Sequence, residues 1–185
     1  MATVIGNNGS ETLNGTNGSD RIEANGGNDR VLAKDGSDTV FGGNGNDEIN
    51  GEGGNDTLLG GLGADILDGD GGRDTVSYQD VAVAVTVDLA AGPATGAGLD
   101  TLQQIENVIG SELGDTIVGD NPFLGIGGDN TLNGAGGNDT VSGLGGDDNL
   151  RGGTGNDTLK GNDGDDRLDG EEGDDRLYGN DGNER

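Results

Sequence analysis

The chain has 185 residues, of which 43 are glycine and 36 are aspartate or glutamate, and its formal net charge is -27. Only 28% of the residues are hydrophobic, against about 45–50% in ordinary soluble domains, which excludes a core of several packed layers. The absence of Cys and His excludes disulfides, zinc sites built from these residues, and Ser-His-Asp or Cys-His catalysis. The acidity argues against nucleic-acid partners, and no apolar run is long enough to be a transmembrane segment.

The sequence repeats with a period of nine residues. Eight consecutive nonapeptides occupy 6–77, six more occupy 125–178, one stands alone at 110–118, and a truncated one follows at 179–185. Position four of the unit is glycine everywhere except at Leu113, and position eight is aliphatic in every whole unit. Such regularity predicts a repeat architecture and excludes a disordered low-complexity tract.

These phases divide the chain into three parts. We expect a first repeat block at 1–77, a non-repetitive spacer at 78–124 that contains the isolated unit, and a second repeat block at 125–185. A separately folded domain within the spacer is excluded by its small size.

Within the spacer, the alternation of residues 81–89 predicts a strand. Residues 92–98 read as a loop, residues 102–109 are again apolar at intervals, and residues 119–124 read as a surface loop.

One aliphatic residue per unit suits a very short strand with a single inward side chain, and the six residues before it form a turn. Two nonapeptides then make one coil of 18 residues, with turns alternating between two edges. The predicted fold is therefore all-β, a parallel β-solenoid in which each turn stacks on the turn two units later.

Position six carries an acidic residue in every unit but one. Stacked turns would align these side chains in columns, about 4.8 Å apart along each column. Asn130 is the one neutral member, and Glu11 and Glu184 lie near the two ends of the chain. The aspartates at this position are Asp20, Asp29, Asp38, Asp47, Asp56, Asp65, Asp74, Asp115, Asp139, Asp148, Asp157, Asp166 and Asp175.

Columns of carboxylates at this spacing repel one another unless cations lie between them. Hard oxygen ligands without nitrogen or sulfur favour Ca²⁺, which accepts six to eight oxygens in tolerant geometry, over Mg²⁺. Turn carbonyls would complete the ligand sets. Counting the gaps between stacked turns predicts about ten calcium ions, and because the aliphatic core is thin we expect the calcium-free chain to be largely disordered.

Two units show the pattern in full: residues 42–50 read GGNGNDEIN and residues 152–160 read GGTGNDTLK. The chain resembles the RTX, or haemolysin-type calcium-binding, repeat family, whose unit is GGxGxDxUx. The resemblance covers about three quarters of the chain. It implies a right-handed parallel β-roll with each Ca²⁺ held between two turns.

On this resemblance the position-six aspartates are metal ligands, with Glu11, Asn130 and Glu184 as weaker ones. The resemblance also implies carbonyl ligands from position-four glycines, namely Gly18, Gly27, Gly36, Gly45, Gly54, Gly63, Gly137, Gly146, Gly155 and Gly164.

The family further implies a bacterial protein exported by type I secretion, secreted or held at the cell surface, which is unfolded inside the cell and folds outside it. Because the chain ends inside a repeat, we expect it to be part of something longer. We expect a monomer whose uncapped ends leave end-to-end association open.

The leading interpretation is a calcium-dependent folding module or scaffold that is not an enzyme. One alternative is an accessory module of a secreted enzyme whose catalytic domain lies outside this chain. The other is a recognition or adhesion module for a polysaccharide or a cell surface. For the last, Phe41 and Leu59 would stack on the outside of one sheet as a small apolar patch. The row of Thr39, Thr57 and Thr75 begins with Arg21 and is too interrupted for an ice-binding face.

Overall fold

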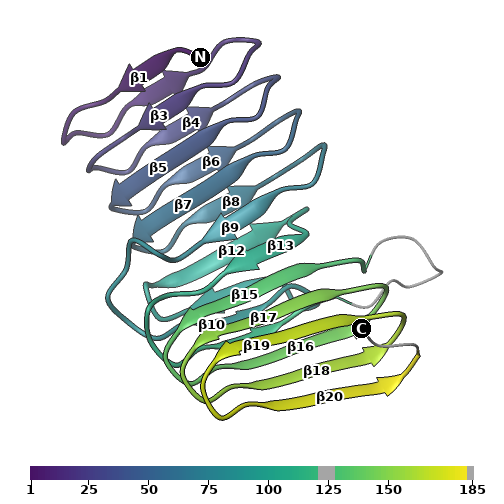
Figure 1. The fold of residues 1–185 in the computed structure, drawn as a ribbon. Coiled ribbons are helices and arrows are strands. Elements are labelled where there is room, and N and C mark those ends of the chain that lie inside the picture. Colours follow the sequence, from purple (N-terminus) through teal and green to yellow (C-terminus); the bar gives the residue numbers. More distant parts are fainter. Residues whose placement is uncertain (121–127, 183–185) are drawn as a thin grey trace. The chain divides into compact units, whose positions relative to one another are not determined.

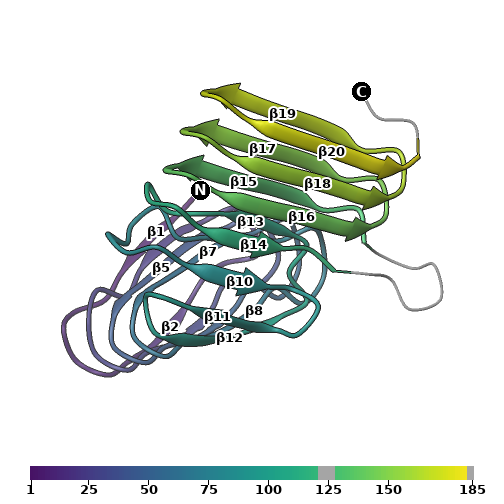
Figure 2. The same cartoon turned by 90° about the horizontal axis from the view of Figure 1, so that it is seen from below.

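The computed structural model describes residues 1–120 and 128–182. The chain divides into two compact units, Met1–Val81 with Pro93–Ile105 and Ala82–Gly92 with Glu106–Arg185. All regular elements in these described residues are β-strands, and Figures 1 and 2 show them stacked one behind the other in each unit. The predicted all-β solenoid is therefore confirmed. Of the surface loop predicted at 119–124, residues 121–124 lie outside the described part.

The first unit has two sheets, and the strands alternate between them along the chain. One sheet contains β1 (Thr3–Ile5), β3 (Arg21–Glu23), β5 (Thr39–Asn44), β7 (Thr57–Leu62) and β9 (Thr75–Ser77). The other contains β2 (Thr12–Asn14), β4 (Arg30–Leu32), β6 (Glu48–Asn50), β8 (Ile66–Asp68), β12 (Leu99–Gln103) and β11 (Pro93–Thr95).

The second unit is built in the same way. One of its sheets contains β13 (Asn107–Ile109), β15 (Thr131–Gly136), β17 (Asn149–Thr154) and β19 (Arg167–Glu172). The other contains β10 (Thr86–Asp88), β14 (Thr116–Val118), β16 (Thr140–Gly145), β18 (Thr158–Asp163) and β20 (Arg176–Asp181).

Residues 18 apart pair in parallel, as the nonapeptide period predicts. Ile22 pairs with Val40, and Val40 pairs with Leu58. In the second unit Leu132 pairs with Leu150 in the same register. Two nonapeptides therefore make one coil, and every second turn shares an edge.

Most of the core of each unit is formed by aliphatic side chains from position eight, one row from each sheet. These side chains are at most 9% exposed from Leu13 to Leu159. In the last two strands the burial fades: Leu168 is half-buried, and Leu177, which we expected to point inward under cover, is 48% exposed. No strand in the described part of the chain follows β20 in its sheet, which accounts for the exposure of Leu177 in this structure.

The spacer differs from its prediction in two places. The strand predicted over 81–89 is confined to β10, although Val81, Val85 and Val87 are all buried. The predicted loop at 92–98 contains β11, which pairs antiparallel with β12. The chain makes a short hairpin here, because antiparallel strands need only a tight connection whereas parallel strands need a full coil.

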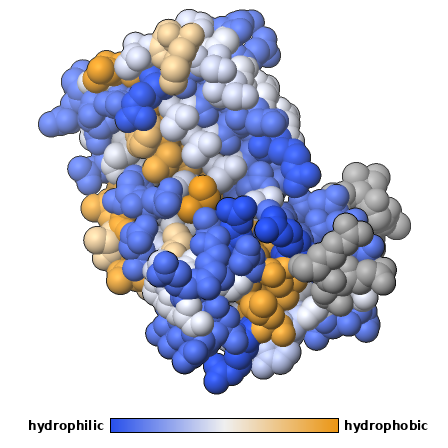
Figure 3. Space-filling view, in the orientation of Figure 1, coloured by the Kyte–Doolittle hydropathy of each residue, from blue (hydrophilic) through white to orange (hydrophobic). Residues whose placement is uncertain are grey.

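The outer surface is mostly hydrophilic in the view of Figure 3. Phe41 and Leu59 pair in register as expected, but they do not form an exposed patch. Leu59 is only 7% exposed, and the guanidinium carbon of Arg21 lies 4.1 Å from the centre of the Phe41 ring. Among the described residues no helix is long and apolar enough to cross a membrane.

Candidate metal sites

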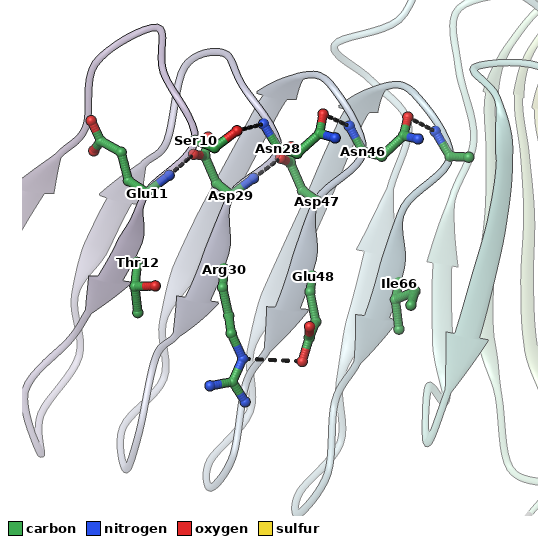
Figure 4. Close-up of a pocket in the computed structure, with 11 residues that line it drawn as sticks. Ser10, Glu11, Thr12, Asn28, Asp29, Arg30, Asn46, Asp47, Glu48 and Ile66 are labelled. Atoms are coloured by element: carbon green, nitrogen blue, oxygen red, sulfur yellow. Dashed lines mark hydrogen bonds and ion pairs between the residues drawn. The ribbon is translucent and has the colours of Figure 1, made fainter.

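The position-six side chains point inward and are aligned in columns by the parallel register. Figure 4 shows Glu11, Asp29 and Asp47 in successive turns of the first unit. The amide N–H of Asp29 donates to Oδ1 of Asp47 at 2.8 Å, and the amide of Asp47 donates to Oδ1 of Asp65 at 2.8 Å. Each carboxylate thus accepts a hydrogen bond from the backbone amide of the turn one coil earlier, and these bonds hold the column in register alongside the backbone ladder.

The second oxygen of these carboxylates is buried and is left over by the hydrogen-bond network. Aspartates at position six are at most 3% exposed through most of both units. A buried carboxylate oxygen without a donor is costly, and native structures seldom retain one without a cation or a water. Within the described residues, the Oδ2 atoms that accept no hydrogen bond include those of Asp29, Asp38, Asp47, Asp56, Asp65, Asp139, Asp148 and Asp157.

This unused oxygen lies beside a backbone carbonyl of the next coil. An ideal Cβ built on Gly42, at position one, would lie 2.5 Å from Oδ2 of Asp47 and 2.6 Å from the carbonyl oxygen of Gly60. The same pair of oxygens meets Gly51, where the neighbours are Asp56 and the carbonyl of Gly69. A Cβ at Gly42 or Gly51 would therefore lie too close to both oxygens. Two earlier units do carry alanine at position one, Ala24 and Ala33, and both alanines are fully buried.

Position four needs glycine for a different reason. Gly45 has a φ of 126°, in the region that side-chain-bearing residues avoid, and a Cβ there would collide with the carbonyl of Gly27. The carbonyls predicted as ligands at this position thus face the next turn. Carbonyls at position one, such as that of Gly60, also lie close to the point that Oδ2 of Asp47 approaches, and these were absent from the predicted ligand set.

Burial and neighbouring carboxylates raise the pKa of several interior aspartates, among them Asp38, Asp47 and Asp157. Desolvation is the main cause, and it raises the pKa of Asp56 to about 6 and those of Asp65, Asp139 and Asp148 to about 7. Near neutral pH the columns therefore carry charge that the surrounding protein does not stabilise. A cation beside each unused oxygen would remove this penalty.

A second ladder at position five was missed by the sequence analysis. The amide of Asn46 donates to Oδ1 of Asn28 at 3.0 Å, and the amide of Ala64 donates to Oδ1 of Asn46 at 3.0 Å. These bonds run from the later coil to the earlier one, opposite in direction to the bonds of the carboxylate column (Figure 4). Short acceptors at position five in most units are the signal that could have revealed it.

The two rows border a shallow groove of about 550 Å³ along one edge of the first unit. Its lining is dominated by position five and position seven of successive coils, including Asn28, Asn46, Arg30 and Glu48. Nε of Arg30 and Oε1 of Glu48 form an ion pair of 3.1 Å within it. The groove exposes mostly polar groups that are already paired with one another.

The first turns of the columns differ from the interior turns. Oδ2 of Asp20 accepts the amide of Thr16 at 2.6 Å and its hydroxyl at 2.9 Å. The backbone bond from Thr16 is the main reason why the pKa of Asp20 is lowered, in contrast to the raised pKa of Asp38. In Asp115 the pKa is raised, because burial outweighs the bonds that this carboxylate accepts.

Asn130 lies in the first nonapeptide turn of its column, one coil after Glu106, and this turn begins earlier than predicted. A Cβ on Gly119 would meet Oδ1 of Asn130 and the carbonyl of Gly143, which is the arrangement of a position-one glycine. Gly119 therefore takes the place that the nonapeptide count assigned to Gly125, a residue outside the described part. Glu184, another predicted ligand, also lies outside it, and Asp175 is half-buried and accepts the amide of Asp157 at 2.9 Å.

Asp100 is a further member of a column that the sequence analysis missed. It is 2% exposed, and its Oδ1 accepts the amide of Asp65 at 3.1 Å, as a position-six aspartate would. Its Oδ2 accepts the hydroxyl of the buried Tyr78 at 3.1 Å. Gly98, Asp100 and Leu102 follow the GxDxU part of the repeat, a signal hidden because the preceding hairpin breaks the period.

The donor set fits calcium better than any other common metal. Nowhere in residues 1–120 and 128–182 do three acidic side chains converge on one point. Each gap between turns offers instead one buried anionic oxygen and nearby backbone carbonyls. Ca²⁺ accepts such mixed oxygen sets, whereas zinc and other nitrogen- or sulfur-loving metals would lack their ligands.

Comparison with known families gives an independent result. The RTX calcium-binding nonapeptide repeat matches four segments of the chain, residues 5–40, 41–76, 124–159 and 151–183. A comparison with curated proteins finds no significant match. The four segments together cover more than half of the sequence and coincide with the stacked coils. The chain belongs to the family of RTX calcium-binding nonapeptide repeat proteins.

Proposed function

We propose that this chain is a calcium-dependent folding module, in which Ca²⁺ ions lie between stacked turns and complete the β-solenoid. The observation that carries the proposal is the unused, buried Oδ2 of the interior position-six aspartates, such as Asp47, beside a position-one carbonyl such as that of Gly60. The ligands are the interior position-six aspartates together with turn carbonyls. Calcium supplies positive charge at these oxygens when it is bound.

The charge balance supports many ions per chain. About ten Ca²⁺ ions, the number expected from the gaps between turns, would offset most of the formal charge of -27. At a free calcium concentration a hundredfold above each dissociation constant, every site adds about 2.7 kcal/mol to the stability of the folded chain. Without these ions we expect the thin aliphatic core to be too small to hold the fold.

The biological setting that we propose is a bacterial protein secreted by the type I route, with the module serving as scaffold and folding aid. RTX repeats are typical of secreted bacterial proteins. The steep dependence of folding on calcium would keep the chain unfolded where calcium is scarce and fold it outside the cell. We propose no catalytic role for the module, because calcium would sequester its carboxylate pairs.

A calcium titration tests the proposal. The chelated chain is titrated with Ca²⁺ while far-ultraviolet circular dichroism follows β-structure, and Mg²⁺ serves as the control. We expect a cooperative transition from coil to β-structure with Ca²⁺ alone. A chelated chain that is already β-structured and does not respond to Ca²⁺ would contradict the proposal.

A further inference from the structure

Two of the columns begin with a carboxylate that is closed by its own turn. Thr16, at position two, donates its amide and its hydroxyl to Oδ2 of Asp20 at 2.6 and 2.9 Å. Ser111, also at position two, donates its amide to Oδ2 of Asp115 at 2.6 Å and its hydroxyl to Oδ1 at 3.0 Å. The Oδ2 atom, which accepts no hydrogen bond in the interior turns, therefore accepts one in these first turns.

The difference lies in the backbone at position two. In interior turns this residue has a left-handed φ, as at Glu52 (64°), Asp70 (61°) and Ala135 (76°). The amides of these residues point away from the carboxylate and donate to the side chain two residues earlier, at 2.7, 3.2 and 3.1 Å. Thr16 and Ser111 are not left-handed, so their amides turn toward position six.

In the other two columns, the first nonapeptide turn is also closed by an amide at position two. The amide of Asn7 donates to Oε1 of Glu11 at 3.1 Å, and the amide of Asp120 donates to Oδ1 of Asn130 at 3.0 Å. The Nδ2 of Asn130 donates in turn to Oδ1 of Asp120 at 3.1 Å and to the carbonyl of Glu106 at 2.9 Å. At this first position a neutral side chain satisfies all of these bonds.

The sequence departs from aspartate at the same places. Among the position-six residues that the structure describes in the nonapeptides, only Glu11 and Asn130 are not aspartate. Each of the two lies in the first nonapeptide turn of its column, and Asn130 follows Glu106 by one coil. Interior positions, where an anionic oxygen remains unused, are aspartate throughout those repeats. Departures from aspartate are therefore confined to closed turns, although the closed turns of Asp20 and Asp115 retain it.

We propose that the first turn of each column is closed by the residue at position two and holds no calcium, so that the calcium sites begin at the second carboxylate. This inference rests on the proposed calcium binding and refines it. The gaps beside these first turns then hold no calcium, so the chain binds fewer than the roughly ten ions expected if every gap between stacked turns held one. Thr16 and Ser111 are then positioning residues that substitute hydrogen bonds for a cation.

A matched pair of variants tests the inference. Asp20→Asn and Asp38→Asn each remove one negative charge from neighbouring members of the same column. The number of Ca²⁺ ions bound per chain is measured by equilibrium dialysis and metal analysis. We expect Asp20→Asn to bind as many ions as the wild type and Asp38→Asn to bind at least one fewer. Equal losses in the two variants would overturn the inference, and a wild type that binds no calcium would overturn the proposed function as well.

A second pair tests the role of position two directly. Thr16→Gly permits the left-handed conformation of the interior turns and removes the hydroxyl, so we expect it to bind one more ion than the wild type. Asn25→Gly is the control, because Asn25 is already left-handed with a φ of 75°, and we expect it to bind the wild-type number. An unchanged number in Thr16→Gly would refute the closing role of Thr16.

Discussion

Replacing Asp56 by asparagine separates the ligand role of this side chain from its structural role. Oδ1 of Asp56 accepts the amide of Asp38 at 2.8 Å, and an asparagine oxygen can keep that bond. Oδ2 is buried without a donor among the described residues and lies near the carbonyl of Gly69. The substitution therefore removes the charged ligand and keeps the backbone contact.

The expected size of the effect follows from the binding equilibrium. At free calcium a hundredfold above the dissociation constant, losing one site lowers the free energy of unfolding by about 2.7 kcal/mol. Without calcium the sign reverses, because burial raises the pKa of Asp56 to about 6 and its charge at neutral pH opposes folding. The variant should be less stable than the wild type in calcium and no less structured in chelator.

Thermal unfolding in calcium, circular dichroism in chelator and the number of bound ions together measure this prediction. Asp70→Asn is the matched control, since Asp70 is exposed and has a left-handed φ of 61° that asparagine tolerates. We expect the control to match the wild type in all three measurements. An unchanged ion number and melting temperature in Asp56→Asn would refute the register and the ligand role.

Three further predictions follow from the geometry. In chelator, lowering the pH from 8 to about 4 should increase the β-structure measured by circular dichroism. Burial raises the pKa of four interior carboxyls from 3.8 to about 6 or 7, so protonation stabilises the folded chain and this stabilisation is lost as the pH rises through 6 to 7. An identical spectrum at about pH 4 and pH 8 would count against this prediction. Tyr78→Phe leaves Oδ2 of Asp100 buried without its donor and should cost about 1–3 kcal/mol in thermal or urea unfolding, whereas Tyr178→Phe, at a side chain that is 46% exposed, should have no effect. Gly45→Ala forces a Cβ against a carbonyl at a φ of 126° and should raise the calcium concentration needed for folding, while Gly26→Ala, whose nearest new contact would be 3.6 Å, should leave it within error of the wild type.

The regular part of the fold could be predicted from sequence because one residue type recurs at each structural position. The aliphatic residue at position eight sets the core, and pairs such as Ile22 and Val40 fall in register 18 residues apart. The position-six aspartates fall into buried columns by the same arithmetic. Periodicity alone was sufficient here, because each coil packs only against its neighbours.

Sequence reasoning failed where the local conformation leaves the period. The hairpin of β11 and β12 shifts Asp100 out of phase, so its place in a column was hidden. The closing bonds of Thr16 and Ser111 depend on a backbone angle at position two that composition does not encode. Leu59 was predicted to lie on the outside because its register was known, but register says nothing of what packs over a side chain.

The hydrogen-bond ladders at positions five and six run in opposite directions and link the addition of each coil to the coil before it. The position-five amide of each added coil donates a hydrogen bond to the position-five side chain of the coil before it, as Asn46 does to Asn28. The position-six carboxylate of the added coil accepts a hydrogen bond from the buried amide of the earlier coil, as Asp47 does from Asp29. Both bonds are made by adjacent residues of one turn, Asn46 and Asp47, so the docking of that turn forms them together and satisfies amides in two coils at once.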